Sequence, residues 1–232
     1  MTVVDLALAV PPESPYRIEQ LTAILDDDER ERARRFRHDD DRVVYITAHA
    51  LTRLALSRRR PDVETTDWRF ADGPWGRPHP VNPETGELQV NQSSTPGMAA
   101  VVVAEGVEVG VDVEWTGADD WIWETADSVF APAEVATLLH LDEEARRDRF
   151  FLYWTLKESY IKARGMGVSL PLTLISFART DGDDVVLDLD PSLEDDASSW
   201  TFETFHPGPD IRGAVAVRSS SLELAVSWPA VI

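Results

Sequence analysis

The chain has 232 residues, no cysteine and a formal net charge of −20. The lack of cysteine excludes disulfides, thiolate zinc sites and cysteine nucleophiles, and the negative charge argues against binding to nucleic acid or to an anionic membrane surface. Hydrophobic residues make up 43% of the chain, which is enough for a packed core in one large domain or in two lobes.

The N-terminal half is predicted to fold as helices on a small sheet. The start of the chain lacks the basic segment of a signal peptide, and no apolar run reaches the ~20 residues of a membrane span, so we expect a cytoplasmic protein. Residues 3–10 alternate like an edge strand. Acidic residues 26–29 open one helix, and a second helix runs from about 41 to 60, where Pro61 ends it. Further strands are predicted at 68–70, 88–91, 98–104 and 107–114.

The C-terminal half repeats this plan. One helix is predicted to begin at Pro132 and a longer one to span 143–164. Strands are predicted to follow at 175–178, 185–189, 200–205, 214–217 and 222–227. This order indicates an α+β fold of two similar lobes, each with helices packed on a small antiparallel sheet. We place the lobes at residues 1–111 and 112–232, with the active site at their interface.

Lysine is almost absent from this sequence. Of the 22 basic residues, only Lys157 and Lys162 are lysines, and they flank Glu158. A chain that otherwise uses arginine is expected to keep lysine where a compact ammonium is needed. On a helix, Trp154, Glu158 and Lys162 share one face. The simpler alternative is an ordinary surface ion pair between Glu158 and Lys162.

A second acidic pair lies upstream, in the alternating run 107–114. If this run is a strand, the carboxylates of Asp112 and Glu114 point to the same side. Taken alone, they are most simply explained as acids that face solvent. Brought together with Glu158 and Lys162, they would form a site for a divalent metal facing a phosphate.

The two motifs together resemble the paired signature of the 4′-phosphopantetheinyl transferases. The first is Gly-Val-Asp-Val-Glu at 110–114, and the second is Trp-Thr-Leu-Lys-Glu-Ser-Tyr-Ile-Lys at 154–162. Segments 34–36, 75–78 and 165–172 also fit, so the resemblance covers residues 25–178. It is to the surfactin-synthetase type, in which two similar lobes form a pseudo-twofold arrangement within one chain, and it implies a monomer.

The resemblance implies a reaction and roles for these residues. Mg²⁺, with Mn²⁺ as an alternative, would be held by Asp112, Glu114 and Glu158 and would bind the pyrophosphate of coenzyme A. A serine of an acyl or peptidyl carrier protein, serving fatty-acid, polyketide or nonribosomal-peptide synthesis, would attack the β-phosphorus. Glu158 would accept the serine proton, and Lys162 would stabilise the leaving phosphate.

Further residues are assigned to coenzyme A by the same resemblance. Arg42, Arg77 and Ser93 match positions at the coenzyme A phosphates. Lys162 would join them from the helix, and Lys157 would either contact a phosphate or extend along the helix surface.

One position departs from the family pattern. Ser94 stands in the phosphate site where the family usually has a histidine, which predicts coenzyme A binding weaker by ~1–3 kcal/mol. His49, on the second predicted helix, is a candidate to fill the gap. The departure keeps open a weakened homologue that serves as a binding module for coenzyme A or a carrier protein. From the carboxylates alone, a metal-dependent phosphohydrolase is a further alternative.

Three tryptophans fall within residues 115–123. They predict either a buried cluster or an exposed apolar platform for the carrier protein, because aromatic residues dominate protein interfaces.

Overall fold

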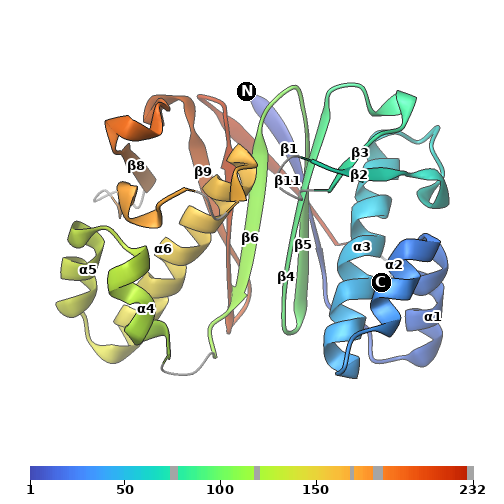
Figure 1. Cartoon of the computed structure of the whole chain (residues 1–232), viewed down its shortest axis with the longest axis horizontal. Coiled ribbons are helices and arrows are strands. Elements are labelled where there is room, and N and C mark those ends of the chain that lie inside the picture. The colour runs from blue at the N-terminus through green and yellow to red at the C-terminus, as the bar shows by residue number, and fades with distance from the viewer. Residues whose placement is uncertain (74–77, 118–120, 168–169, 180–184, 229–232) are drawn as a thin grey trace.

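Strands form the centre of the molecule and helices cover both outer sides in the computed structural model (Figure 1). The structure describes residues 1–73, 78–117, 121–167, 170–179 and 185–228. The α-helices are α1 (Pro15–Ile24), α2 (Asp27–Arg34), α3 (Asp39–Arg59), α4 (Trp121–Val129), α5 (Pro132–Leu139) and α6 (Glu143–Arg164). The strands are β1 (Thr2–Ala9), β2 (Phe70–Asp72), β3 (Pro78–Pro80), β4 (Leu88–Thr95), β5 (Met98–Glu105), β6 (Val109–Trp115), β7 (Ile175–Arg179), β8 (Val185–Leu189), β9 (Thr201–Gly208), β10 (Ile211–Val217) and β11 (Leu222–Ser227).

Two sheets pack face to face, and each carries one long helix on its outer face. The first has the strand order β11-β1-β5-β4 and is covered by α3, while the second has the order β6-β10-β9 and is covered by α6. Smaller two-stranded sheets, β2-β3 and β7-β8, lie beside these layers. The prediction of an α+β fold built from two lobes of similar plan is confirmed.

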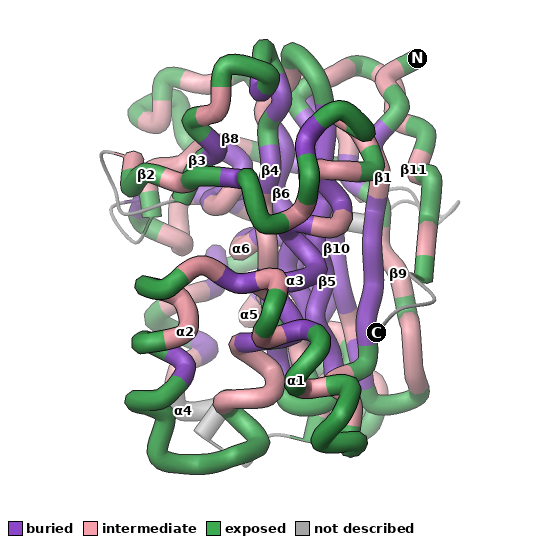
Figure 2. The backbone as a smooth tube through the Cα atoms, turned by 90° about the vertical axis from the view of Figure 1, so that its right-hand side faces the viewer, coloured by how far each residue is buried: buried purple, intermediate pink, exposed green. Residues whose placement is uncertain are grey.

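The alternation of side chains along the strands creates these layers. On β6, Val109, Val111 and Val113 face the core between the two sheets, as do Val215 and Val217 of β10. The intervening residues of β10 face α6, whose side chains fill a second core. On the other sheet, the alternate residues of β1 and β5 pack against α3. Figure 2 shows the result, with buried backbone concentrated in the central strands and much of α1 and α2 exposed.

The prediction that residues 3–10 form an edge strand was wrong in one respect, because β1 lies inside its sheet. One side of β1 pairs with β5 in antiparallel fashion, and the other side pairs in parallel with β11, from Thr2↔Leu222 to Ala7↔Ser227. The C-terminal strand therefore belongs to the N-terminal sheet, which is mixed and not antiparallel throughout as predicted. The division at 111/112 stays a prediction, and the structure places that boundary inside β6.

Two helices were not predicted. α1 follows Ser14 and has proline in its first turn, but only Leu21 is buried in it, so its apolar pattern is weak. α4 lies in the tryptophan-rich segment. No α-helix in the described part of the chain is long and apolar enough to cross a membrane.

Gly110 determines how closely α6 approaches β6. A Cβ atom at this position would collide with the backbone of α6, at the carbonyl oxygen of Ser159 and the amide nitrogen of Ala163. Backbone atoms cannot rotate away as a side chain can, so only glycine permits this contact. Because Glu158 and Lys162 flank Ser159 and Ala163 on α6, the same contact brings them to the strand that carries Asp112 and Glu114.

We predict that Gly110→Ala lowers the free energy of unfolding by about 1–3 kcal/mol or more, because the added methyl group forces α6 away from β6. Urea denaturation of the variant and the parent protein measures the change. Gly208→Ala is the matched control, since a Cβ there meets only Ile211 Cγ1, at 3.8 Å. Equal stabilities of the two variants would contradict the close-approach argument.

Candidate active site between the two lobes

Polar side chains of β4 join the two sheets where their edges meet. Asn91 Oδ1 accepts a hydrogen bond from the backbone N–H of Val111 (2.9 Å), and Thr95 Oγ1 accepts one from the N–H of Trp115 (2.9 Å). Between them, the hydroxyl of Ser93 donates to Asp112 Oδ1 (2.9 Å). Alternate residues of β4 therefore satisfy polar groups of β6 and fix the position of its carboxylates.

Asp112 is the centre of a buried network that spans both lobes. The ammonium of Lys162, on α6, donates to Asp112 Oδ1 (2.6 Å) and to Ser93 Oγ (2.8 Å). Asp112 is only 2% exposed, and its second oxygen, Oδ2, is buried without a hydrogen-bond partner. Such an acceptor is costly to leave unpaired, so Oδ2 is a point where a ligand cation would be stabilised.

Glu114 and Glu158 add negative charge beside Asp112. Trp154 Nε1 donates to Glu114 Oε1 (3.1 Å), which ties the strand to α6. Burial, followed by the charge of Asp112, raises the pKa of Glu114 to about 7. Burial and Asp112 also raise the pKa of Glu158, whereas Lys162 acts in the opposite direction. Burial and the neighbouring carboxylate thus disfavour the ionised forms of Glu114 and Glu158, as expected of a site that accepts a cation.

Carboxylate oxygens are the ligands that a hard divalent cation prefers, but these side chains do not converge on one point. No group of three or more His, Asp or Glu side chains within the described ranges lies close enough together to hold a metal ion. The fit rests on the unpaired Oδ2 of Asp112 and on the oxygen ligands of Glu114 and Glu158, since Mg²⁺ and Mn²⁺ prefer oxygen.

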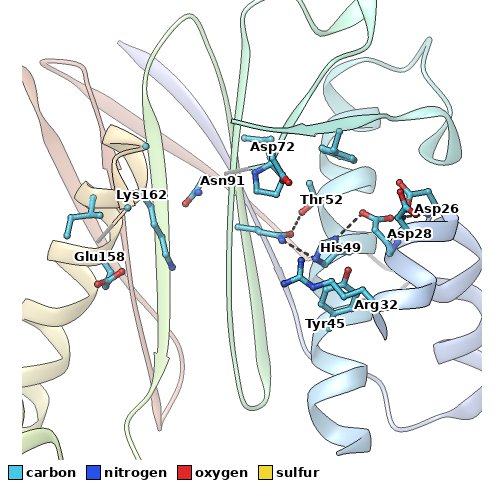
Figure 3. Close-up of a pocket in the computed structure, with 18 of the residues that line it drawn as sticks. Asp26, Asp28, Arg32, Tyr45, His49, Thr52, Asp72, Asn91, Glu158 and Lys162 are labelled. Atoms are coloured by element: carbon cyan, nitrogen blue, oxygen red, sulfur yellow. Dashed lines mark hydrogen bonds and ion pairs between the residues drawn. The ribbon is translucent and has the colours of Figure 1, made fainter. Parts of the chain in front are cut away.

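A cavity of about 660 Å³ extends from this network across β4 to α2 and α3. Figure 3 shows Glu158 and Lys162 on one side, Asn91 near the middle, and Arg32, Tyr45 and His49 on the other. The size is typical of a site for a cofactor-sized molecule. Its walls come from both halves of the chain. That the active site lies at the lobe interface stays a prediction. The other lining residues in the described part of the chain are Asp26, Asp28, Glu29, Thr52, Phe70, Asp72, Pro78, Val90, Gln92, Ile161, Gly165, Gly167, Leu170 and Leu172.

The far wall is held by a second buried network that the sequence did not predict. Arg53 is fully buried and pairs with Asp26 and Glu29, both at 2.8 Å. Asp26 and Glu29 also form the capping box of α2, the one local sign of their structural role. Glu29 Oε1 further contacts His49 Nδ1 (3.0 Å). Burial opposes the charge of Glu29, but hydrogen bonds from His49 and from the Asp26 N–H, with the charge of Arg53, lower its pKa to about 2.

The predicted phosphate contacts are not all at the cavity. Ser93 lies within the Asp112 network, and Ser94 is exposed on the wall of a neighbouring cavity of about 480 Å³, which His49 also lines. Arg42 pairs with Asp39 (3.0 Å) and lines neither cavity. Arg77 lies outside the described residues.

Lys157 points away from the site. It is 1% exposed, and its ammonium contacts Glu134 Oε2 (2.6 Å) and donates to the carbonyl oxygens of Leu172 (2.9 Å) and Ile175 (2.5 Å). Burial lowers the pKa of Lys157 and raises the pKa of Glu134, and each charge offsets part of that effect in the other. A buried and fully paired ammonium cannot contact a phosphate in the cavity. We therefore assign Lys157 a structural role in place of the predicted contact with coenzyme A.

The tryptophan segment is described only in part. Trp115 is 41% exposed. The structure does not describe the side chains of Trp121 and Trp123. The choice between a buried cluster and a carrier platform therefore stays a prediction.

Comparison with known proteins shows which family the chain resembles. A model of the 4′-phosphopantetheinyl transferase superfamily matches residues 108–218, the segment that carries Asp112, Glu114, Glu158 and Lys162. Over this segment the chain is similar to the superfamily. A curated member, 4′-phosphopantetheinyl transferase Sfp of Bacillus subtilis (strain 168), is 28% identical over 204 residues, covering 88% of this chain and 87% of that protein. 4′-Phosphopantetheinyl transferase HetI of Nostoc sp. (strain PCC 7120) is 29% identical over 208 residues, covering 89% and 83%.

Solved structures of the superfamily also match. The ACPS–CoA complex of Chronobacterium ammoniagenes is 19% identical and covers 49% of this chain and 96% of that one, with a TM-score of 0.42. The holo-[acyl-carrier-protein] synthase of Thermotoga maritima is 20% identical and covers 50% of this chain and 65% of that one, with a TM-score of 0.40.

Glu29 makes stability depend on pH. Its pKa is lowered from 4.5 to about 2, so it stabilises the folded state above pH ~5, and this contribution is lost as pH falls toward 2. We predict that Glu29→Gln costs about 3 kcal/mol at pH 7 and less than half of that at pH 3. Denaturation curves across this pH range measure it. Glu31→Gln, an exposed site on the same helix, is the control and should show no such trend; a pH-independent cost at Glu29 would contradict the assignment.

A substitution can test whether Lys157 stabilises the fold or contacts coenzyme A. We predict that Lys157→Met lowers the free energy of unfolding by about 3–5 kcal/mol, because Glu134 is left buried and unpaired. The double variant with Glu134→Gln should recover part of the loss. Calorimetric titration of folded Lys157→Met with coenzyme A should give an unchanged affinity. A stable variant with reduced affinity would restore the phosphate-contact hypothesis.

Proposed function

We propose that this protein transfers the 4′-phosphopantetheine group of coenzyme A to a serine of an apo acyl or peptidyl carrier protein. The observation that carries the proposal is the buried network of Ser93, Asp112 and Lys162, flanked by Glu114 and Glu158, at one end of a cofactor-sized cavity. This arrangement pairs a site for a cation with an ammonium group, which suits a pyrophosphate.

Asp112, Glu114 and Glu158 would hold Mg²⁺ or Mn²⁺. When bound, the ion would neutralise negative charge on the pyrophosphate and orient it for displacement. The unpaired Oδ2 of Asp112 and the raised pKa values of the two glutamates favour this assignment. Lys162 already reaches toward β6 from α6 and would contact the phosphate that leaves.

In the proposed step, the carrier serine Oγ attacks the β-phosphorus of coenzyme A. A new O–P bond forms, and the bond from this phosphorus to the bridging oxygen of the α-phosphate breaks. The products are the phosphopantetheinylated serine and adenosine 3′,5′-bisphosphate. Glu158 takes the serine proton, directly or through water. Lys162 stabilises the charge that develops on the leaving phosphate.

The proposed enzyme acts as a monomer, because both walls of the cavity come from a single chain. Its macromolecular partner is the carrier protein. Two rival functions remain outcomes of the test: a module that binds coenzyme A without transfer, which Ser94 motivates, and a phosphohydrolase that uses the same carboxylates.

Intact-mass spectrometry tests the proposal with an apo carrier protein, coenzyme A and Mg²⁺. We expect a phosphopantetheine adduct on the carrier. Glu158→Gln should reduce the rate by about 10²–10⁴-fold, because the proton acceptor is lost. Lys162→Ala should also slow transfer, by about 10²-fold or more, because the charge on the leaving phosphate is no longer stabilised.

Glu144→Gln, on an exposed turn of the same helix, is the matched control and should leave the rate unchanged. Tight coenzyme A binding without an adduct on a fatty-acid, polyketide or nonribosomal-peptide carrier protein would favour the binding module. Cleavage of coenzyme A without an adduct would favour the hydrolase.

A further inference from the structure

Asp195 is a buried acid that lines neither cavity. It lies in the connection between β8 and β9, and its side chain is only 1% exposed. Its Oδ2 atom accepts hydrogen bonds from the hydroxyl of Tyr160 (2.7 Å), from Nη1 of Arg164 (2.5 Å) and from Nε1 of Trp200 (2.9 Å). Its Oδ1 atom accepts one from Nη2 of Arg218 (2.9 Å). A single carboxylate therefore binds side chains from α6, from the end of β10 and from its own loop.

The neighbours of Asp195 keep it ionised. Burial opposes the charge of the carboxylate, but hydrogen bonds from Tyr160 and from the N–H of Asp196, together with the charge of Arg164, lower its pKa. The preceding residue, Glu194, has left-handed backbone (φ 50°, ψ 40°), which costs free energy for a residue with a side chain. The loop therefore holds a strained residue directly before the acid that it buries, and such strain is most frequent at functional positions.

The last turn of α6 has different partners on its two faces. Tyr160 and Arg164 are four residues apart, share one face of the helix, and both contact Asp195. Lys162 lies between them in the sequence, about 200° around the helix from each. Its ammonium contacts Asp112 on β6 (2.6 Å). The turn is thus held by Asp195 on one face and presents Lys162 to the site on the other.

Arg218 connects Asp195 to the sheet that carries the site. It follows the end of β10, and besides Asp195 it contacts Glu108 Oε1 (3.2 Å), directly before β6. The backbone N–H of Arg218 also donates to the carbonyl oxygen of Glu108 (3.0 Å). Its guanidinium lies over the ring of Trp200, which packs edge to face on Tyr160 with centroids 4.9 Å apart. Through these contacts, α6 is joined to the ends of β6 and β10.

Lys162 is held in the site by short contacts of 2.6 and 2.8 Å, so a small movement of its helical turn would displace the ammonium. We propose that Asp195 is a positioning residue for the transfer and acts on Lys162. Through Tyr160 and Arg164 it fixes the last turn of α6, from which the ammonium of Lys162 reaches the leaving phosphate. The inference rests on the proposed function, because it takes Lys162 as the group that stabilises this phosphate.

The scarcity of lysine allows a direct measurement of where Lys162 is held. Protein labelled with ¹³Cε-lysine carries the label only at Lys157 and Lys162, and Lys162→Ala removes one NMR signal and so assigns both. We expect Asp195→Asn, which keeps the shape of the side chain and removes its charge, to shift the signal of Lys162 and to leave that of Lys157 in place. Asp196→Asn is the matched control, because it makes the same change at the adjacent exposed acid, and it should move neither signal.

Transfer kinetics separate positioning from a general loss of structure. Asp195→Asn should lower kcat by about 10- to 100-fold, the scale of a misplaced catalytic group. When Lys162→Ala is already present, adding Asp195→Asn should cost no more than about twofold, because the group that Asp195 positions is absent. Tyr160→Phe removes only one hydroxyl donor to Asp195, so it should fold even if Asp195→Asn does not. It should shift the Lys162 signal and lower kcat in the same way, by smaller amounts.

Two results would overturn the inference. The first is an unmoved Lys162 signal in a folded variant of Asp195 or Tyr160. The second is a set of rate losses that multiply in the double variant, since Asp195 would then act independently of Lys162. The NMR measurement needs no carrier protein, so a missing adduct together with a displaced Lys162 signal would reject only the proposed function.

Discussion

The arrangement of this molecule depends on one buried carboxylate. Asp112 lies on the edge strand of one sheet and accepts a hydrogen bond from Ser93, on the edge strand of the other. It is also paired with Lys162 of α6, the helix that covers its sheet. A charged group at this depth is costly unless its partners are held in place. Gly110 makes that possible, because it lets the backbone of α6 approach β6 closely. Packing and the chemistry of the site are therefore determined by the same contact.

The strand β4 contributes to structure and to ligand recognition through its two faces. Asn91, Ser93 and Thr95 face β6 and join the lobes. The alternate residues Gln92 and Ser94 line the cavities beside α3, which Asn91 and Thr95 also border. The strand predicted at 88–91 thus extends to Thr95, and its polar residues both join the lobes and line the cavities. This division explains why His49, from α3, shares a cavity wall with Ser94.

Local periodicity was sufficient for much of the fold and for the central residues of the site. The helix 143–164 and the strand 222–227 were predicted with their observed bounds, and spacing alone placed Asp112 with Glu114 and Glu158 with Lys162. Interactions between residues that lie far apart in the sequence were not predicted. The two lysines differ because Lys157 meets Glu134, on another helix, and Arg53 carries no local sign that it pairs with Asp26 and Glu29.

The pairing of β11 with β1 has a consequence for how the chain is made. During synthesis from the N-terminus, β1 emerges first and its parallel partner more than 200 residues later. Until then, one side of β1 exposes unpaired backbone groups that could template pairing with another chain. Contacts this remote in sequence also form slowly. The nascent protein therefore passes through a prolonged stage in which its first strand is vulnerable to aggregation, and that stage ends only when translation has delivered β11.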